Sequence, residues 1–147
     1  MRLPIILLQF LLGLMIWIPV NAEDFNPREI YSETSKAVVL ITGFELGQRI
    51  ITKGTGSIIS REGFILTNAH VVIEEKKGRP FSNLRVFLKP DRLSGDIKKD
   101  TALKYRAELV SFSENLDLAL LRMKSSPQGS PPAVLKFSDS DLVSIGD

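Results

Sequence analysis

The chain has 147 residues, of which 44% are hydrophobic and 24% are charged, a balance typical of a globular protein with one domain. The formal net charge is only +2 and the basic residues form no block, so the composition gives no sign of a nucleic-acid-binding surface. The sequence contains no cysteine, which excludes a fold stabilised by disulfides and leaves packing as the source of stability.

Residues 1–22 have the pattern of a secretory signal peptide. Arg2 gives a positive start, an apolar run extends from Ile5 to Ile18, and Val20 and Ala22 place small residues at the −3 and −1 positions of a cleavage site. The alternative is an uncleaved membrane anchor, but the apolar run is shorter than the roughly 20 residues that a bilayer requires. We therefore expect cleavage near Ala22, export to the periplasm or cell envelope, and no stable membrane span afterwards.

Residues 23–36 are predicted to lead into the following sheet through a short helix. Asn26 is a candidate N-cap, Pro27 suits the first helical position, and Glu29 lies three residues after Asn26 as in a capping box.

Residues 37–123 have the pattern of an antiparallel all-β domain. Ser60 to Gly63 is predicted to form a tight hairpin turn in which Gly63 takes a positive φ. Two polar stretches, residues 74–82 and 89–103, are predicted to be surface loops. The strand pattern alone allows either a small barrel or a sandwich. The predicted strands are short and rich in Val, Ile, Leu and Phe: residues 37–42, 49–53, 55–60, 64–67, 84–88, 105–112 and 118–123.

Residues 124–147 are predicted to leave this domain. Lys124 to Ala133 contains three prolines and has no apolar periodicity, which is typical of a linker. The remaining segment, from Val134 to Asp147, is too short to form a domain.

His70, the single histidine of the chain, is the first candidate functional residue. A lone histidine after an apolar strand is more often structural than catalytic. Here the strand that begins at Phe64 breaks at Asn68, and the small residue Ala69 follows. His70 is therefore expected at the end of the strand, where its side chain can face a cleft.

Asp117 is the second candidate, because it lies directly before the apolar run from Leu118 to Leu121. Its ordinary interpretation is a turn aspartate. In the functional interpretation, Asp117 is buried and accepts a hydrogen bond from one imidazole nitrogen of His70. That bond would fix the tautomer, so that the other nitrogen can take a proton from a hydroxyl group.

The segments around these two candidates resemble a known family. Gly54 to Ile59 (GTGSII), followed by Gly63 to Val72 (GFILTNAHVV), is similar to the bacterial HtrA/Deg (DegP-like) group of trypsin-like serine proteases. Leu116 to Leu121 (LDLALL) looks like that family's aspartate strand. Leu135 to Asp141 (LKFSDSD), with Ile145 to Asp147, is similar to its passage into a second barrel.

The resemblance implies a chymotrypsin-like fold, in which two six-stranded antiparallel barrels enclose the active site between them. The first barrel would contribute His70 and Asp117 as catalytic residues. The second barrel, of which residues 124–147 would be the approach and the beginning, is expected to supply the serine and the oxyanion hole and is missing from this sequence. No serine here has the flanking glycines of the family's nucleophile, so we expect the chain alone to be inactive.

Two functions therefore stay open. The first is the amino-terminal portion of an exported serine endopeptidase that cleaves unfolded or misfolded polypeptides, for which the resemblance implies a homotrimer. The second is a non-catalytic peptide-binding or scaffold module, that is, a pseudoprotease. We expect no cofactor, no metal and no nucleic-acid partner, because one histidine, no cysteine and scattered carboxylates form no ligand cluster.

Overall fold

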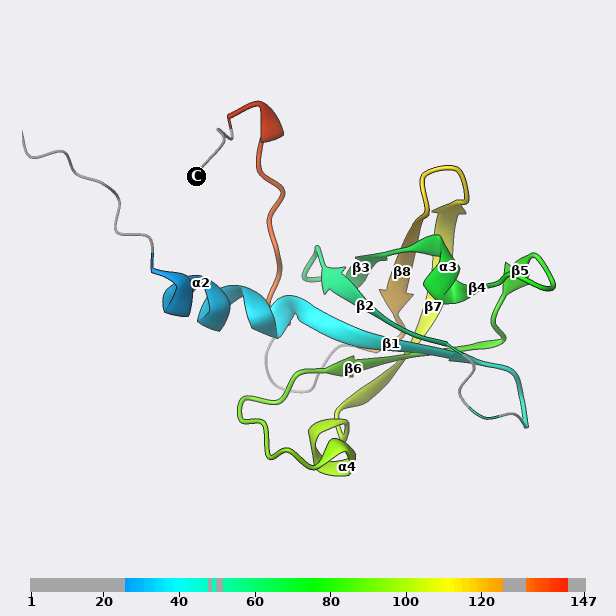
Figure 1. The fold of residues 1–147 in the computed structure, drawn as a ribbon, viewed down its shortest axis with the longest axis horizontal. Helices are drawn as coiled ribbons and strands as arrows, with labels where there is room; N and C mark the ends of the chain where they lie inside the picture. Colours follow the sequence, from blue (N-terminus) through cyan, green and yellow to red (C-terminus); the bar gives the residue numbers. More distant parts are fainter. Residues whose placement is uncertain (1–25, 48, 50–51, 126–131, 143–147) are drawn as a thin grey trace, which may run out of the picture.

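The computed structural model describes residues 26–47, 49, 52–125 and 132–142 (Figure 1). The predicted signal peptide, residues 1–22, lies outside these residues. In the part of the chain that the structure describes, no helix has both the length and the apolar character that crossing a membrane requires.

Six antiparallel strands form a closed barrel in the order β1-β2-β3-β8-β7-β6, in which β6 pairs with β1 (Figure 1). This topology confirms the predicted all-β fold with a six-stranded antiparallel barrel, and the sandwich alternative is wrong. Because this sheet closes on itself, none of its six strands has an unpaired edge. The strands are β1 (Val38–Phe44), β2 (Thr52–Ile58), β3 (Phe64–Thr67), β6 (Asn83–Leu88), β7 (Lys104–Ser113) and β8 (Leu118–Met123).

The barrel interior is filled by aliphatic side chains from alternate positions of the strands, as the two-residue period of a strand requires. The largest fully buried hydrophobic side chains are Ile41, Ile58, Ile65, Leu121, Val39, Val72 and Val86. Val72 comes from a short helix that closes one end of the barrel, and the other six come from the strands.

Strand β2 differs from the prediction, which placed two strands at residues 49–53 and 55–60. Thr52–Ile58 is one continuous strand, in which Gly54 pairs with Ile41 of β1. Glycine is needed at this position because Val71 packs against it. A Cβ atom on residue 54 would lie 2.7 Å from Val71 Cγ1, closer than a van der Waals contact. Gly54 therefore marks a close approach between two elements and does not interrupt the strand.

Helix α2 (Pro27–Thr34) begins where the sequence predicts. The Asn26 side chain accepts a hydrogen bond from the Glu29 backbone N–H at 3.3 Å, and Pro27 takes the first helical position. A 3-10 turn, η1 (Ser35–Ala37), connects α2 to β1. No residue of α2 is buried, and the helix projects from the barrel (Figure 1).

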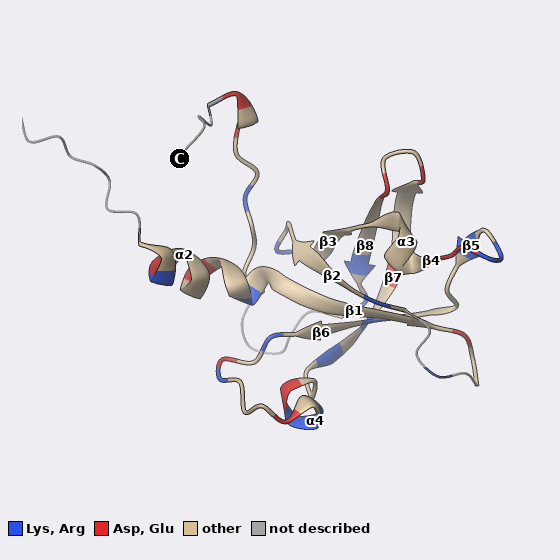
Figure 2. Ribbon diagram, in the orientation of Figure 1, with Lys and Arg blue, Asp and Glu red and all other residues tan. Residues whose placement is uncertain are grey.

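The two predicted loops contain more structure than their polar sequences indicate. The first folds into a small hairpin of β4 (Ile73–Glu74) and β5 (Arg79–Pro80), and Phe81 behind it is buried, so this segment is not entirely surface. The second contains the short helix α4 (Ile97–Asp100), which has no buried residue. The ribbon in Figure 2, coloured by residue type, shows both basic and acidic residues on α2, on α4 and around the β4–β5 turn.

Residues 132–139 have no regular secondary structure, and a 3-10 turn, η2 (Ser140–Leu142), follows. The Leu135 N–H donates to the Ile58 carbonyl at 2.9 Å, and Ala133, Val134 and Leu135 pack against the barrel core. The chain thus returns to the end of β2 after the predicted linker, part of which lies outside the described residues.

Candidate active site

The pairing of β3 with β8 brings together two residues that are 47 positions apart in the sequence. In this antiparallel pair, Thr67 at the end of β3 lies opposite Ala119 near the start of β8. The segment that follows β3 and the loop that precedes β8 therefore meet at the same rim of the barrel. A register slip of one residue would turn every side chain of β8 to the opposite face.

His70 lies on a four-residue helix, α3 (Ala69–Val72), which follows β3 after Asn68. The sequence predicted the end of a strand here but not a helix. Ala69, Val71 and Val72 are buried, whereas the His70 side chain is 58% exposed. The helix is thus fixed by its apolar face against the barrel, and it presents the imidazole at the surface.

Asp117 ends the loop between β7 and β8, which lies beside α3 at the top of Figure 1. Its N–H donates to the Glu114 carbonyl at 3.1 Å, and its backbone takes a φ of +49°. Within the described residues, it is the only residue other than glycine with a positive φ. Aspartate is among the residues that tolerate this left-handed conformation, which turns the chain into β8.

The structure places the two sequence-predicted residues in direct contact. His70 Nδ1 lies 2.7 Å from Asp117 Oδ2, and the His70 backbone N–H donates to Asp117 Oδ1 at 3.0 Å. Since an ionised carboxylate can only accept, the short contact favours the tautomer with a proton on Nδ1. In that tautomer Nε2 has a free lone pair and can take a proton from another group.

The Asp117 carboxylate is less buried than its sequence context predicts. Its side chain is 45% exposed, so the prediction of a buried aspartate is wrong in this chain. The pair lies at the rim of the barrel, on α3 and the β7–β8 loop, and not in the core.

Hydrogen bonds hold the pKa of Asp117 below its ordinary value. The largest cause is the backbone N–H of His70, followed by the His70 side chain, and the Asn68 side chain acts in the same direction. All three stabilise the ionised carboxylate. Asp117 is therefore charged at neutral pH and available to stabilise an imidazolium ion.

The serines of the described region have other places in the fold. Ser57 lies on β2, Ser60 Oγ accepts from the Phe64 N–H in the β2–β3 turn, and Ser113 Oγ accepts from the Leu116 N–H. Across the described ranges, no serine hydroxyl forms a hydrogen bond with the His70 ring. The same part of the chain holds no group of three or more His, Cys, Asp or Glu side chains that could bind a metal ion.

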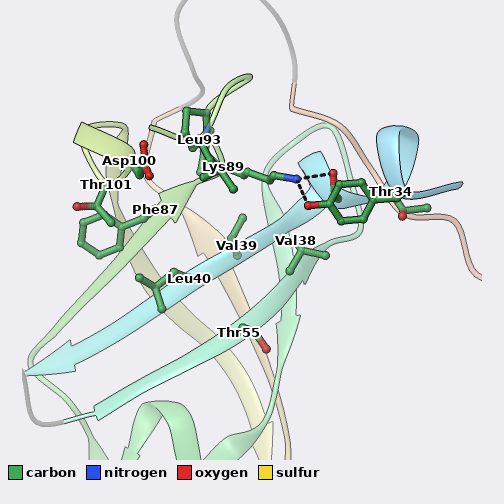
Figure 3. A pocket seen from close by; sticks show the side chains of 14 residues that line it. Thr34, Val38, Val39, Leu40, Thr55, Phe87, Lys89, Leu93, Asp100 and Thr101 are labelled. Atoms are coloured by element: carbon green, nitrogen blue, oxygen red, sulfur yellow. Dashed lines mark hydrogen bonds between the residues drawn. The ribbon is translucent and has the colours of Figure 1, made fainter. Parts of the chain in front are cut away.

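A cavity of about 480 Å³ lies away from this pair, between α2, β1 and β6 (Figure 3). Val38, Leu40 and Phe87 contribute apolar walls. At one end, Lys89 Nζ donates to Tyr31 Oη at 2.9 Å and to Ser35 Oγ at 2.8 Å, as the dashed lines in Figure 3 indicate. These bonds attach α2 to the barrel. Neither His70 nor Asp117 lines the cavity.

A closed six-stranded antiparallel barrel with this topology matches the first barrel of a chymotrypsin-like fold. The structure is similar to the serine endoprotease from Yersinia pestis, with a TM-score of 0.52 and 26% identity, over 71% of this chain and 30% of that one. The sequence model of one protein family, the trypsin-like peptidase domain, matches residues 54–147 of this chain. The chain therefore belongs to the trypsin-like peptidase family, in its HtrA/DegP-like branch.

Several proteases are also similar to this chain in sequence. The magnetosome formation protease MamE of Magnetospirillum gryphiswaldense is 38% identical over 94 residues, which are 64% of this chain and 10% of MamE. A probable periplasmic serine endoprotease, DegP-like, from Chlamydia trachomatis is 31% identical over 100 residues, 68% of this chain and 16% of that protein. Serine protease HTRA1 of Xenopus tropicalis is 33% identical over 89 residues, 60% of this chain and 15% of that protein.

Proposed function

We propose that the complete protein is an exported, HtrA-like serine endopeptidase, in which His70 is the general base and Asp117 orients it. The observation that carries this proposal is the 2.7 Å contact between His70 Nδ1 and Asp117 Oδ2 at the rim of a trypsin-like barrel. A non-catalytic module would not require this pair, so its hydrogen-bonding geometry favours the peptidase over the pseudoprotease.

In this mechanism, His70 Nε2 takes the proton of a serine hydroxyl as the serine oxygen attacks the carbonyl carbon of a peptide bond. The imidazolium that forms is stabilised by the ionised Asp117, which does not itself become protonated. His70 then gives the proton to the departing amine, and a water molecule hydrolyses the acyl-enzyme with His70 again as the base.

The serine and the oxyanion hole are proposed to come from a second barrel outside these residues. The chain spans only 10% to 16% of the length of the three relatives above. Within the described residues, no serine hydroxyl forms a hydrogen bond with the His70 ring. Without the serine, the pair is expected to provide no proteolysis, since the members of a triad act as a unit.

A fluorophosphonate probe tests this proposal directly. The protein produced from its natural gene, with whatever sequence follows residue 147, should be labelled on one serine and should degrade unfolded casein. A His70→Ala variant should lose both properties. The 147-residue chain alone should not be labelled. A labelled serine within residues 23–147 would refute the assignment, and a complete protein that resists the probe would favour the pseudoprotease function instead.

Unfolded or misfolded polypeptides in the cell envelope are the proposed substrates, and a homotrimer is the proposed assembly. The predicted signal peptide and the likeness to a protease named as periplasmic support this location. N-terminal sequencing of the exported protein should give Glu23 as the first residue. Recovery of intact Met1 in the membrane fraction would contradict export by cleavage, and the mass in solution would test the trimer.

A further inference from the structure

Asn68 makes two contacts that the proposed mechanism does not use. Its Nδ2 group donates to Asp117 Oδ2 at 3.1 Å and to the carbonyl oxygen of the same residue at 3.1 Å. One amide therefore binds both the side chain and the backbone of a residue that is 49 positions away in the sequence.

We propose that Asn68 is a positioning residue, which holds the Asp117 carboxylate in line with the His70 ring. The proposal rests on the proposed function only for its effect on proteolysis. The arrangement of the pair itself can be measured in this chain, whether or not the complete protein is a peptidase.

The position of Asn68 in the fold argues against a merely local role. It is the N-cap residue of α3, a position at which asparagine commonly accepts a hydrogen bond from the helix. Here the Asn68 side chain makes no cap hydrogen bond. Its amide group is directed to Asp117 instead, so the residue serves the neighbouring hairpin rather than its own helix.

The hydrogen bonds of the carboxylate indicate what Asn68 adds. Oδ1 accepts from the His70 backbone N–H, and Oδ2 accepts from both His70 Nδ1 and Asn68 Nδ2. The torsion of an aspartate carboxylate has a broad energy minimum, so its plane is set by its donors. Without Asn68, every remaining donor among these three would come from His70, the residue that must itself be oriented.

The backbone contact acts on the same geometry. Asp117 takes a φ of +49°, a left-handed conformation that aspartate tolerates but adopts less readily than glycine, and its carbonyl accepts from Asn68 Nδ2. Because the pair is about half exposed, water competes for these groups. All three donors belong to residues 68–70, so this barrel contains the groups that orient its own histidine and aspartate.

Nuclear magnetic resonance of the 147-residue chain, labelled with ¹⁵N-histidine, tests the proposal, because the chain has one histidine. The long-range ¹H–¹⁵N spectrum gives the tautomer populations of His70. In the wild type we expect the Nδ1–H form to dominate at a pH where the ring is neutral. In Asn68→Ser, the population ratio of the Nδ1–H to the Nε2–H form should fall at least twofold. Serine is a good N-cap, so a helix-capping role would be preserved while the contact with Asp117 is lost.

Asn115→Ala is the matched control, since Asn115 lies in the same loop and no described residue forms a hydrogen bond with its side chain. It should keep the wild-type tautomer ratio. Asn68→Ala is the second variant and should behave like Asn68→Ser. An unchanged ratio in a folded Asn68 variant would overturn the proposal, as would unfolding of both variants, which would make Asn68 a structural residue.

The carboxylate provides an independent readout. Losing a donor to the ionised form should shift the titration of Asp117 to higher pH in Asn68→Ser. Among the described side chains that contact Asp117, His70 is the titratable one, and Glu114 in the same loop contributes its carbonyl oxygen. In the complete protein, kcat should fall by roughly tenfold to a hundredfold with little change in KM, because a charge-assisted hydrogen bond is lost. If the Asn68 variants change the tautomer ratio but the complete wild-type protein has no peptidase activity, the proposed function is wrong and the positioning role of Asn68 stands.

Discussion

The substitution Gly54→Ala tests whether β2 positions the helix that carries His70. An ideal Cβ atom on residue 54 would lie 2.7 Å from Val71 Cγ1 and 3.1 Å from Val71 Cβ. Carbon atoms in contact are about 3.5–4.0 Å apart, so α3 and β2 would have to separate by about 1 Å. Val71 is 3% exposed and β-branched, so its side chain cannot rotate out of the way.

Two effects should follow from this displacement. Overpacking of this kind lowers the free energy of unfolding by about 1–3 kcal/mol. For a domain of this size, that corresponds to a fall in Tm of about 4–20 °C. A shift of α3 by about 1 Å would also lengthen the His70–Asp117 contact beyond hydrogen-bond range, with a loss of about a hundredfold in the activity of the complete protein.

Urea unfolding of four proteins measures the first effect: the wild type, Gly54→Ala, Val71→Ala and the double variant. Removing both Cγ atoms of Val71 should relieve the clash, so the double variant should be at least 1 kcal/mol more stable than the sum of the single changes predicts. A Gly54→Ala protein within about 0.5 kcal/mol of the wild type, or a coupling energy of zero, would refute the reasoning.

Three further predictions concern the site and the core. Asp117→Asn should reduce kcat of the complete protein by about ten-thousandfold, because the amide can stabilise the wrong tautomer of His70; a loss below tenfold would contradict the role of Asp117. The lowered pKa of Asp117 means that its contribution to stability is complete above its unfolded pKa, about 3.9, and disappears as the pH falls through the folded value. The difference in urea midpoint between wild type and Asp117→Asn should therefore shrink below about pH 4, and a constant difference down to pH 2 would contradict this. Leu121→Ala, at a fully buried core position, should lower the free energy of unfolding by about 2–5 kcal/mol, whereas Leu116→Ala, at a position 70% exposed, should change it by less than about 0.5 kcal/mol in the same urea titration.

The strands and the turn at Gly63 could be predicted from the sequence because their causes are local. The strands are short segments rich in apolar residues and bounded by turn residues, and Gly63 takes the expected positive φ of 83°. The misplaced break at Gly54 has a different origin. Whether a glycine ends a strand or makes room for a neighbour depends on which side chain lies above it, and Val71 reaches that position only through the tertiary fold.

The sequence identified the two principal residues of the candidate site, but it did not predict the exposure of Asp117, its backbone conformation or the contacts of Asn68. The sequence motifs pointed to His70 and Asp117, and the structure places them in contact. The exposure of Asp117 and its left-handed backbone depend on how the β7–β8 loop sits against α3. Asn68 was interpreted only as the end of a strand. Asn68 lies two residues before His70, which places it near the candidate site. Its partner, Asp117, is 49 positions away, so their contact depends on the tertiary fold.

The antiparallel pairing of β3 with β8 also separates the site from the chain that connects its two halves. The chain between α3 and the β7–β8 loop forms β4, β5, β6, α4 and β7. Within it, the segments 75–78 and 91–96 lie outside strands and helices. Those two segments are therefore places where residues can be inserted, deleted or exchanged between relatives while the imidazole and the carboxylate stay where they are. The length and sequence of these two segments can therefore vary without moving His70 or Asp117.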